Sequence, residues 1–237
     1  MAAGPGRRRE RPVEAAQPAL SGRAVPPAPL AHVYWIGGGS GAGKSTVARR
    51  LADEHGLRLY VTDDVMAEHA RRSPAAGSPA LADFLSMDMD ERWVRRSPET
   101  MLATFHWFRG EGFDLIIDDL MRMPPGPGVL VEGFRLLPEL VRPWAAPGQA
   151  VWLLPTPGFR RAAFDSRGST WQIADRTSDP PRALRNLMER DRMFTDRLRA
   201  DTRRLHLPVI EVDTASTERD LADRVSRALA LRPPPGT

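Results

Sequence analysis

Short apolar runs alternate with longer amphipathic segments between about residue 30 and residue 230. Five runs have the length and composition of buried strands: residues 32–37, 58–63, 129–133, 150–155 and 209–213. The clearest helical patterns fall at residues 44–54, 98–109, 181–205 and 218–229. This alternation predicts an α/β domain with a parallel sheet, in which the polar residues that end each strand meet at one edge.

The two ends of the chain have a different composition. Residues 1–29 are rich in Pro, Ala, Gly and Arg and poor in large apolar side chains, and residues 231–237 contain three prolines. Such segments cannot bury enough apolar surface to offset the entropy lost on ordering. We therefore predict one domain over residues 30–230, with disordered tails at 1–29 and 231–237.

Composition excludes several kinds of protein. The chain has no cysteine, so disulfides and thiolate zinc sites are excluded. No apolar run approaches the ~18 residues that a membrane span needs, and no apolar stretch follows the basic N-terminus as in a secretory signal. We therefore expect a cytoplasmic protein without a membrane partner.

Charge adds a weaker constraint. The formal net charge is +4, and arginines are mixed with acidic residues along the whole chain. A nucleic-acid-binding protein usually gathers its positive charge on one face, so we expect no nucleic-acid partner. The sequence gives no indication of the oligomeric state.

One glycine-rich segment carries most of the chemical information. Residues 37–46 read GGGSGAGKST, and from Gly38 they fit the pattern G-x-x-x-x-G-K-[ST] between an apolar strand and an amphipathic helix. Backbone N–H groups in such a loop can cradle phosphates. The residues predicted to bind nucleotide are Gly38, Gly39, Ser40, Gly41, Ala42, Gly43, Lys44, Ser45 and Thr46.

Two side chains of this loop have distinct predicted roles. Lys44 is the only lysine among 34 basic residues, and it stands where a compact ammonium suits phosphate better than a planar guanidinium. It should act in catalysis by reaching the β- and γ-phosphate oxygens, while the Ser45 hydroxyl should bind Mg²⁺.

The segment GGSGAGKST resembles the phosphate loop (P-loop) of nucleoside and nucleotide kinases, in particular the uridine-kinase-like group. The resemblance extends over about residues 31–230 as an order of elements. It implies a three-layer α/β/α sandwich, a P-loop NTPase fold with a five-stranded parallel sheet in the order 2-3-1-4-5 and a helical lid. It also implies ATP and Mg²⁺ as cofactors.

Other P-loop classes fit less well. A GTPase needs a lysine in its guanine-binding element, and the single lysine already lies in the loop. No LSGGQ-like stretch indicates a transporter ATPase, and the chain is short for a helicase. A kinase or a bare nucleotide-binding module remains.

Two segments compete for the carboxylate that assists Mg²⁺. FDLIIDDL, residues 113–120, ends in Asp118 and Asp119, but its apolar residues follow a helical period, which places both carboxylates mainly on a solvated face. VLVEG, residues 129–133, has the pattern of a buried strand and resembles the corresponding kinase strand. On that resemblance Glu132 would hold a Mg²⁺-bound water, and we prefer it.

The acceptor side is predicted from the ends of two strands. Asp63 and Asp64 resemble the Asp-Asp-aromatic motif of uridine-kinase-like enzymes, with Val65 in place of the aromatic residue. On that resemblance Asp63 is the base that orients the acceptor hydroxyl, and Asp64 could instead cap the next helix. Arg135, in EGFR, resembles a phosphate-binding arginine of adenylate-type kinases and is a substrate candidate.

The lid of such kinases carries arginines that neutralise the transferred phosphoryl group. Arg190 and Arg192, in MERDRMF, resemble the lid pattern and are the predicted catalytic arginines. Arg161 and Arg167 are alternatives. Ion pairing on a solvated helix, as in Arg192–Asp196, would also explain these residues.

These observations predict an ATP-dependent kinase that transfers the γ-phosphoryl group to a hydroxyl of a small molecule, such as a nucleoside, a metabolite or an antibiotic. The alternatives are a nucleotide kinase that acts on a phosphate acceptor and a nucleotide-binding sensor without phosphotransfer. A kinase needs Asp63 and a lid, whereas a sensor needs neither.

Overall fold

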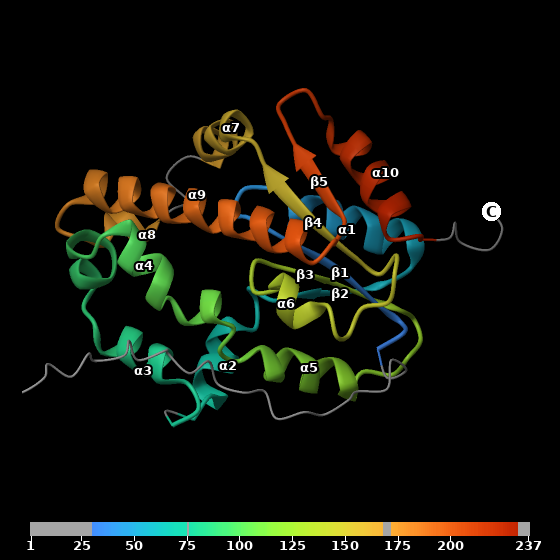
Figure 1. Cartoon of the computed structure of the whole chain (residues 1–237), viewed down its shortest axis with the longest axis horizontal. Helices are drawn as coiled ribbons and strands as arrows, with labels where there is room; N and C mark the ends of the chain where they lie inside the picture. Colours follow the sequence, from blue (N-terminus) through green and yellow to red (C-terminus); the bar gives the residue numbers. More distant parts are fainter. Residues whose placement is uncertain (1–29, 75, 168–171, 232–237) are drawn as a thin grey trace, which may run out of the picture.

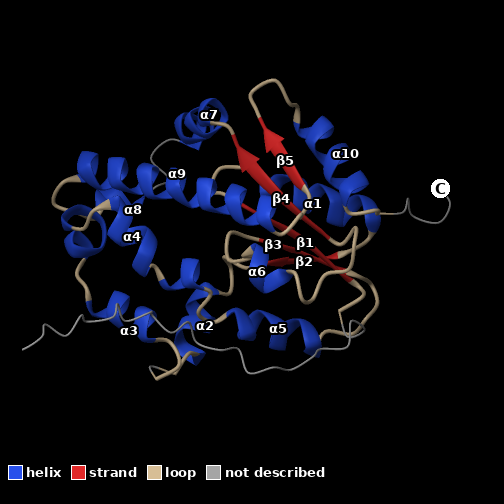
Figure 2. Cartoon of the chain, in the orientation of Figure 1, coloured by secondary structure: helices blue, strands red, loops and turns tan. Residues whose placement is uncertain are grey.

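A computed structural model of the protein describes residues 30–74, 76–167 and 172–231. Within them, the strands are β1 Val33–Gly38, β2 Arg58–Val61, β3 Val129–Glu132, β4 Ala150–Pro155 and β5 Val209–Val212 (Figure 2). All five predicted strands are present, and their ends differ from the prediction by two residues at most. The predicted tails lie outside the described residues, apart from Leu231.

All strand pairs in the sheet are parallel, and the order is β2-β3-β1-β4-β5. Helices cover both faces, so the predicted three-layer α/β/α architecture and the order 2-3-1-4-5 are confirmed (Figure 1). At the carboxyl edge, Val61 of β2 is in register with Glu132 of β3. Because the strands run in one direction, the residues that follow them gather at this edge.

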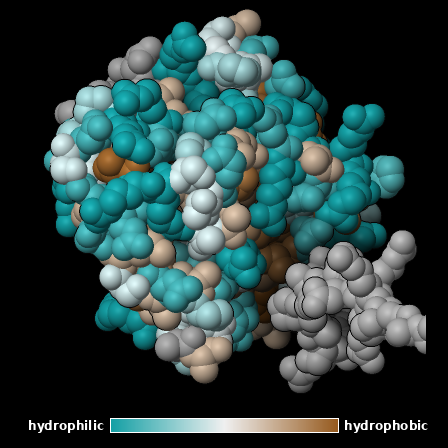
Figure 3. All heavy atoms as spheres, turned by 60° about the vertical axis from the view of Figure 1, so that its left-hand side comes forward, coloured by the Kyte–Doolittle hydropathy of each residue, from teal (hydrophilic) through white to brown (hydrophobic). Residues whose placement is uncertain are grey.

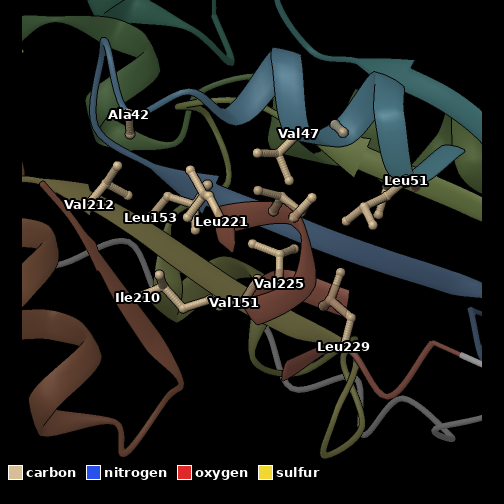
Figure 4. Packing of buried hydrophobic residues seen from close by; sticks show 14 of the residues in the cluster. Ala42, Val47, Leu51, Val151, Leu153, Ile210, Val212, Leu221, Val225 and Leu229 are labelled. Carbon is tan, nitrogen blue, oxygen red and sulfur yellow. The ribbon is translucent and has the colours of Figure 1, made fainter. Parts of the chain in front are cut away.

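One face of the sheet packs against α1 (Lys44–His55) and α10 (Glu218–Ala228). Alternate residues of β1 and β4, including Ile36, Val151 and Leu153, point into this layer and contact the apolar side of both helices (Figure 4). The layer holds α1 against β1, which fixes the loop between them.

The opposite face packs against α5 (Phe113–Arg122), α6 (Pro138–Val141) and α9 (Pro180–Arg204). Trp35 and Trp152 are fully buried there, and the Trp152 indole donates a hydrogen bond to the Leu136 carbonyl at 2.9 Å. The helical period predicted for residues 113–121 is present in α5. Phe113, Ile116, Ile117 and Leu120 are buried, although Met121 is 52% exposed.

A helical insertion connects β2 to α5. It contains α2 (Met66–Arg72), α3 (Pro79–Ser86), the π-helical turn η1 (Glu91–Arg95), α4 (Pro98–Thr104) and the 3₁₀ turn η2 (His106–Arg109). The single helix predicted at residues 98–109 is therefore wrong. The chain is extended at Phe105 (φ −69°, ψ 114°), and this break lets the consecutive residues His106, Trp107 and Phe108 all be buried. A continuous helix would turn one of them to solvent.

The chain after β4 forms α7 (Pro157–Arg167), α8 (Gln172–Asp175) and the long helix α9. Residues 168–171, which belong to the predicted lid, lie outside the described residues. A satellite apolar cluster joins η1, α4, α8 and the first half of α9 through Trp93, Met101, Ala174 and Leu187. The predicted lid segment therefore packs directly on the insertion (Figure 1). Over the described ranges, no helix is long and apolar enough to cross a membrane.

Candidate functional site

The glycine-rich loop leaves β1 at Gly38 and enters α1 at Lys44. Gly43, the residue before the helix, has φ 75° and ψ 9°, a left-handed conformation that glycine adopts without a Cβ clash. The Lys44 ammonium is buried and donates a hydrogen bond to the Gly39 carbonyl at 2.8 Å. The loop thus folds back around its own lysine, and the first N–H groups of α1 are directed at the same place.

Ser45 and Glu132 meet beside this loop. The Ser45 hydroxyl donates a hydrogen bond to the Glu132 carboxylate at the end of β3, and Glu132 is only 2% exposed. Burial raises the pKa of Glu132, while Lys44 and the Ser45 hydrogen bond oppose the shift. The structure therefore brings together the two residues predicted to serve Mg²⁺.

Asp63 lies at the same edge, after β2. It is exposed and lines the cavity described below, and desolvation by the surrounding protein raises its pKa. Lys44 and a hydrogen bond from the Thr62 hydroxyl (3.4 Å) act in the opposite direction. The charge of Asp63 also raises the pKa of Glu132, and Lys44 lowers the pKa of both, so the two carboxylates and Lys44 form one electrostatic cluster.

The chemistry of this cluster fits a magnesium ion. The charges of Glu132 and Asp63 repel each other, and a divalent cation would relieve that repulsion. Within the described parts of the chain, no group of three or more Asp, Glu, His or Cys residues could hold a metal by itself. Mg²⁺ in phosphoryl-transfer sites takes few protein ligands and completes its shell with water and phosphate oxygens. Ser45 and Glu132 would supply the protein's share.

The loop forms one end of a cavity of about 460 Å³. Lys44, Ser45, Asp63 and Glu132 line that end. Aromatic side chains from the insertion and from the segment after β3 line the rest, notably Phe84, Trp93, Phe105, His106, Trp107 and Phe134. On the face that carries α3, α4 and α8, apolar residues appear in recesses between hydrophilic ones (Figure 3). Space for a second molecule is thus continuous with the phosphate loop.

Arg190 of α9 lines the same cavity, as predicted for a lid arginine. Arg190 is 6% exposed. Its guanidinium pairs with Asp191 at 2.7 Å and lies over the rings of Trp93, Phe105 and Phe108 at 5.0–5.4 Å. The Nη1 atom of Arg190 has no hydrogen-bond partner. A buried donor of this kind is costly unless an anion or another acceptor can occupy the space beside it.

Arg192 and Arg135 are placed differently from their predicted roles. Arg192 is exposed and pairs with Glu189 and Asp196, both at 2.7 Å. It is not among the described residues that line the cavity, because the helical period turns it to the outer side of α9. The solvated ion pairs considered in the sequence analysis therefore account for Arg192. Arg161 is also exposed, and the side chain of Arg167 lies outside the described residues.

Arg135 is also absent from the described cavity lining. It is 2% exposed, donates hydrogen bonds to the carbonyls of Thr62 (3.4 Å) and Gly112 (3.0 Å), and lies 4.0 Å from the Trp107 ring. Burial lowers its pKa to about 10. These contacts join Arg135 to Trp107 and to the residue that follows β2, whereas the prediction placed it against the substrate.

The competing carboxylates of α5 are also accounted for. Asp118 is exposed. Asp119 accepts hydrogen bonds from Tyr60 (2.8 Å) and Arg72 (3.0 Å) and lies 2.8 Å from the His69 imidazole. Neither residue is among the described cavity lining. Asp119 therefore joins β2, α2 and α5, and Glu132 is the carboxylate beside the loop.

Asp64 does not cap the helix that follows it, contrary to one alternative in the sequence analysis. Helix α2 begins at Met66 with Val65 at its N-cap, and no side chain caps it. The carbonyl of Asp63 instead accepts a hydrogen bond from the Met66 amide at 3.3 Å. The two adjacent carboxylates thus differ in place, since Asp63 lines the cavity and Asp64 is not among the described lining residues.

Sequence reasoning missed Arg160, which lies behind the loop. Arg160 of α7 is buried and donates a hydrogen bond to the Thr195 hydroxyl at 2.5 Å. A Cβ added at Gly39 would come 2.5 Å from the same hydroxyl. The loop, α7 and α9 are therefore packed together, and Gly39 leaves the space for this contact. The only sign of Arg160 in the sequence was that it is one of several arginines in α7.

Comparisons with known proteins add the following. No family model matches the chain, and no curated protein matches it in sequence. Among solved structures, the chain is similar to that of an uncharacterized protein from Eubacterium ventriosum ATCC 27560, at 14% sequence identity and a TM-score of 0.45. The match covers 84% of this chain and 98% of that chain.

Proposed function

We propose that this protein is a cytoplasmic ATP-dependent kinase that transfers the γ-phosphoryl group to a hydroxyl of a small molecule. The observation that carries the proposal is the shared cavity, in which the phosphate loop, Asp63 and Arg190 border a space for a second substrate. A module that only binds nucleotide needs the loop but has no use for a second chamber or for a carboxylate directed into it.

The residues of the cavity have distinct tasks in this reaction. Lys44 and the loop amides would hold the β- and γ-phosphates, and Ser45 with Glu132, which lie together, would hold Mg²⁺. Bound Mg²⁺ would neutralise charge on the phosphate oxygens. Arg190 presents its unpartnered Nη1 to the transferred group, where charge builds up in the transition state.

Asp63 serves the acceptor. Its carboxylate accepts the hydrogen bond, and then the proton, of the acceptor hydroxyl as the oxygen forms a bond to the γ-phosphorus. The bond between the γ-phosphorus and the β,γ-bridging oxygen breaks, and ADP leaves. A raised pKa makes Asp63 a stronger base than an ordinary aspartate, which suits this task.

A phosphate acceptor receives less support. Apart from Lys44 and Arg190, no lysine or arginine is among the described residues that line the cavity, and Arg135 is engaged elsewhere. Binding a phosphorylated acceptor would require additional cations near the chamber. A hydroxyl acceptor is therefore the better fit.

The test is acceptor-dependent ADP release by the purified protein with ATP and Mg²⁺, screened over a library of hydroxyl-bearing small molecules. We expect at least one compound to stimulate release, with transfer of the γ-phosphoryl group to it by mass spectrometry. Asp63→Asn should lose this stimulation. ATP binding without stimulation by any compound would instead support the nucleotide-binding module.

A further inference from the structure

Apart from His106 and Arg190, the described walls of the chamber beyond the loop are apolar. Its rings come from α3, η1, the Phe105 break with η2, and Phe134 in the segment after β3. Met66, Ile173 and Leu187 complete the lining. No asparagine, glutamine or threonine is among the described lining residues, and the only serines belong to the phosphate loop.

The rings are held in place by one another. Phe84 meets Trp93 edge to face, with centroids 5.6 Å apart, and meets Phe105 at 5.4 Å in the same manner. Phe105 stacks beside Phe134 at 6.4 Å. Rings that are already packed in low-energy arrangements lose little entropy when they contact a ligand. The chamber is therefore pre-formed for a flat apolar surface.

Besides Arg190, His106 is the polar residue in this wall. It is 3% exposed, packs against Phe84 at 5.0 Å and Phe105 at 4.7 Å, and its Nδ1 atom has no hydrogen-bond partner. Burial, with the nearby charges of Arg135 and Arg92, lowers the pKa of His106 to about 4. The ring is therefore neutral near pH 7 and can exchange a hydrogen bond with an uncharged ligand group.

We propose that the phosphoryl acceptor is a flat, largely apolar aromatic alcohol, whose second polar group is bound by His106. This inference rests on the proposed function, since it identifies the molecule that presents its hydroxyl to Asp63. A polyol, a sugar or an aminoglycoside would lose its hydrogen bonds to water on entering this chamber and find few partners there. An aromatic ring would gain both apolar burial and ring contacts.

Adenine is the other flat molecule that could occupy the chamber. The position of the chamber favours the acceptor, because the insertion that supplies most of its rings begins immediately after Asp63. The two possible occupants predict opposite results when ADP and an aromatic probe are present together. If the chamber binds the acceptor, the probe and ADP bind at the same time. If the chamber binds adenine, ADP excludes the probe.

The probes are 4-phenylphenol, biphenyldiols that differ in the position of the second hydroxyl, and myo-inositol as the polyol. Binding is measured by saturation-transfer NMR and calorimetry on the full chain, with and without ADP and Mg²⁺. The aromatic alcohols should bind, and myo-inositol should not. Binding should persist when ADP is saturating.

Matched variants locate the binding. Phe84→Leu should weaken the aromatic probes about 3–10-fold, the range expected for one ring contact. Leu85→Ala, on the same helix but 57% exposed, should leave them unchanged. At least one diol should bind more tightly than 4-phenylphenol, and His106→Leu should remove that preference while His106→Asn retains it.

The outcomes separate this inference from the proposed function. Tight binding of myo-inositol with none of the aromatic alcohols, or displacement of the aromatic probes by ADP, would overturn the inference while leaving the kinase standing. The wild-type competition measurement decides this even if a variant fails to fold. Aromatic alcohols that bind as expected but never stimulate ADP release would overturn the kinase and leave the ligand class of the chamber intact.

Discussion

The hydroxyl of Ser45 donates a hydrogen bond to the carboxylate of Glu132, which joins the start of α1 to the end of β3. The two oxygens are therefore close enough to serve one Mg²⁺. Glu132→Gln keeps the volume and removes the charge. We expect the Mg²⁺ concentration that gives half-maximal ATP binding to rise about 10–100-fold, as when a residue that supports a metal site is lost.

Asp118→Asn is the matched control for Glu132→Gln, because Asp118 is exposed on α5 and is not among the described lining residues. Calorimetric titration of ATP at a series of Mg²⁺ concentrations provides the measurement. An unchanged Mg²⁺ dependence in Glu132→Gln, or an equal change in Asp118→Asn, would contradict the assignment.

Asp63 and Asp64 provide a matched pair for the acceptor side. With a true acceptor, Asp63→Asn should lower kcat about 10²–10⁴-fold while the Kd for ATP is nearly unchanged, since general bases typically contribute that much. Asp64→Asn should have a small effect, because Asp64 is not among the described residues of the cavity wall. Steady-state kinetics of both variants, beside ATP-binding calorimetry, decide the point. Equal effects on kcat would remove Asp63 as the base.

The raised pKa of Asp63 also predicts a pH dependence of stability without any ligand. A carboxyl whose pKa is higher in the folded state binds its proton more tightly there, so its contribution to stability falls as pH rises from the ordinary pKa towards the raised one. Asp63→Asn should therefore melt above wild type at neutral pH, and the difference should vanish at acidic pH. A gap between the two melting temperatures that widens as pH falls would contradict this.

Substitutions at Arg190 and Arg192 compare the cavity side of α9 with its outer side in catalysis. Arg190→Lys keeps a cation beside Asp191, which limits the cost of leaving that buried carboxylate unpaired. The variant loses the planar fork, and we expect kcat with the acceptor to fall about 10²-fold or more. Arg192→Gln should change kcat little, and its free energy of unfolding by less than about 0.5 kcal/mol. A similar loss of kcat in both variants would contradict the assignment of Arg190.

Replacing Asp119 should lower the stability of the fold and leave the Mg²⁺ dependence of ATP binding unchanged. Hydrogen bonds from His69, Arg72 and Tyr60 hold the pKa of Asp119 below its usual value despite partial burial. Asp119→Ala leaves these donors unpaired and should cost about 1–3 kcal/mol of unfolding free energy. In a domain of this size each kcal/mol lowers Tm by roughly 2–4 °C. Thermal unfolding checks the loss, and unchanged stability with weakened Mg²⁺ dependence would reverse the roles of Asp119 and Glu132.

The sequence predicted those features that depend on local pattern. The strands, the loop and the helical period of α5 are visible as periodicity and glycine spacing. The role predicted for Glu132 came from the resemblance of its strand to the kinase strand. The sheet order came from the kinase resemblance. These features need only neighbouring residues and a known order of elements.

The features that sequence patterns did not predict depend on tertiary packing. The break at Phe105 exists because His106, Trp107 and Phe108 are all buried, which no helical period indicates. Arg190 and Arg192 differ by two positions, so only their orientation on α9 separates a cavity residue from a surface ion pair. Arg135 follows the predicted motif but is fixed by carbonyls and by Trp107, which come from distant segments.

Nucleotide binding at the loop is the claim on which the proposed function depends, and one measurement tests it most directly. We compare the rise in Tm that saturating ATP with Mg²⁺ produces in wild type and in Lys44→Met. At a hundredfold excess over Kd, binding stabilises the native state by about 2.7 kcal/mol, which corresponds to roughly 5–10 °C for a domain of this size. Wild type should show this rise, and Lys44→Met, measured against its own ligand-free Tm, should show almost none. An unchanged wild-type Tm at millimolar ATP, or an equal rise in both proteins, would contradict the phosphate-loop assignment.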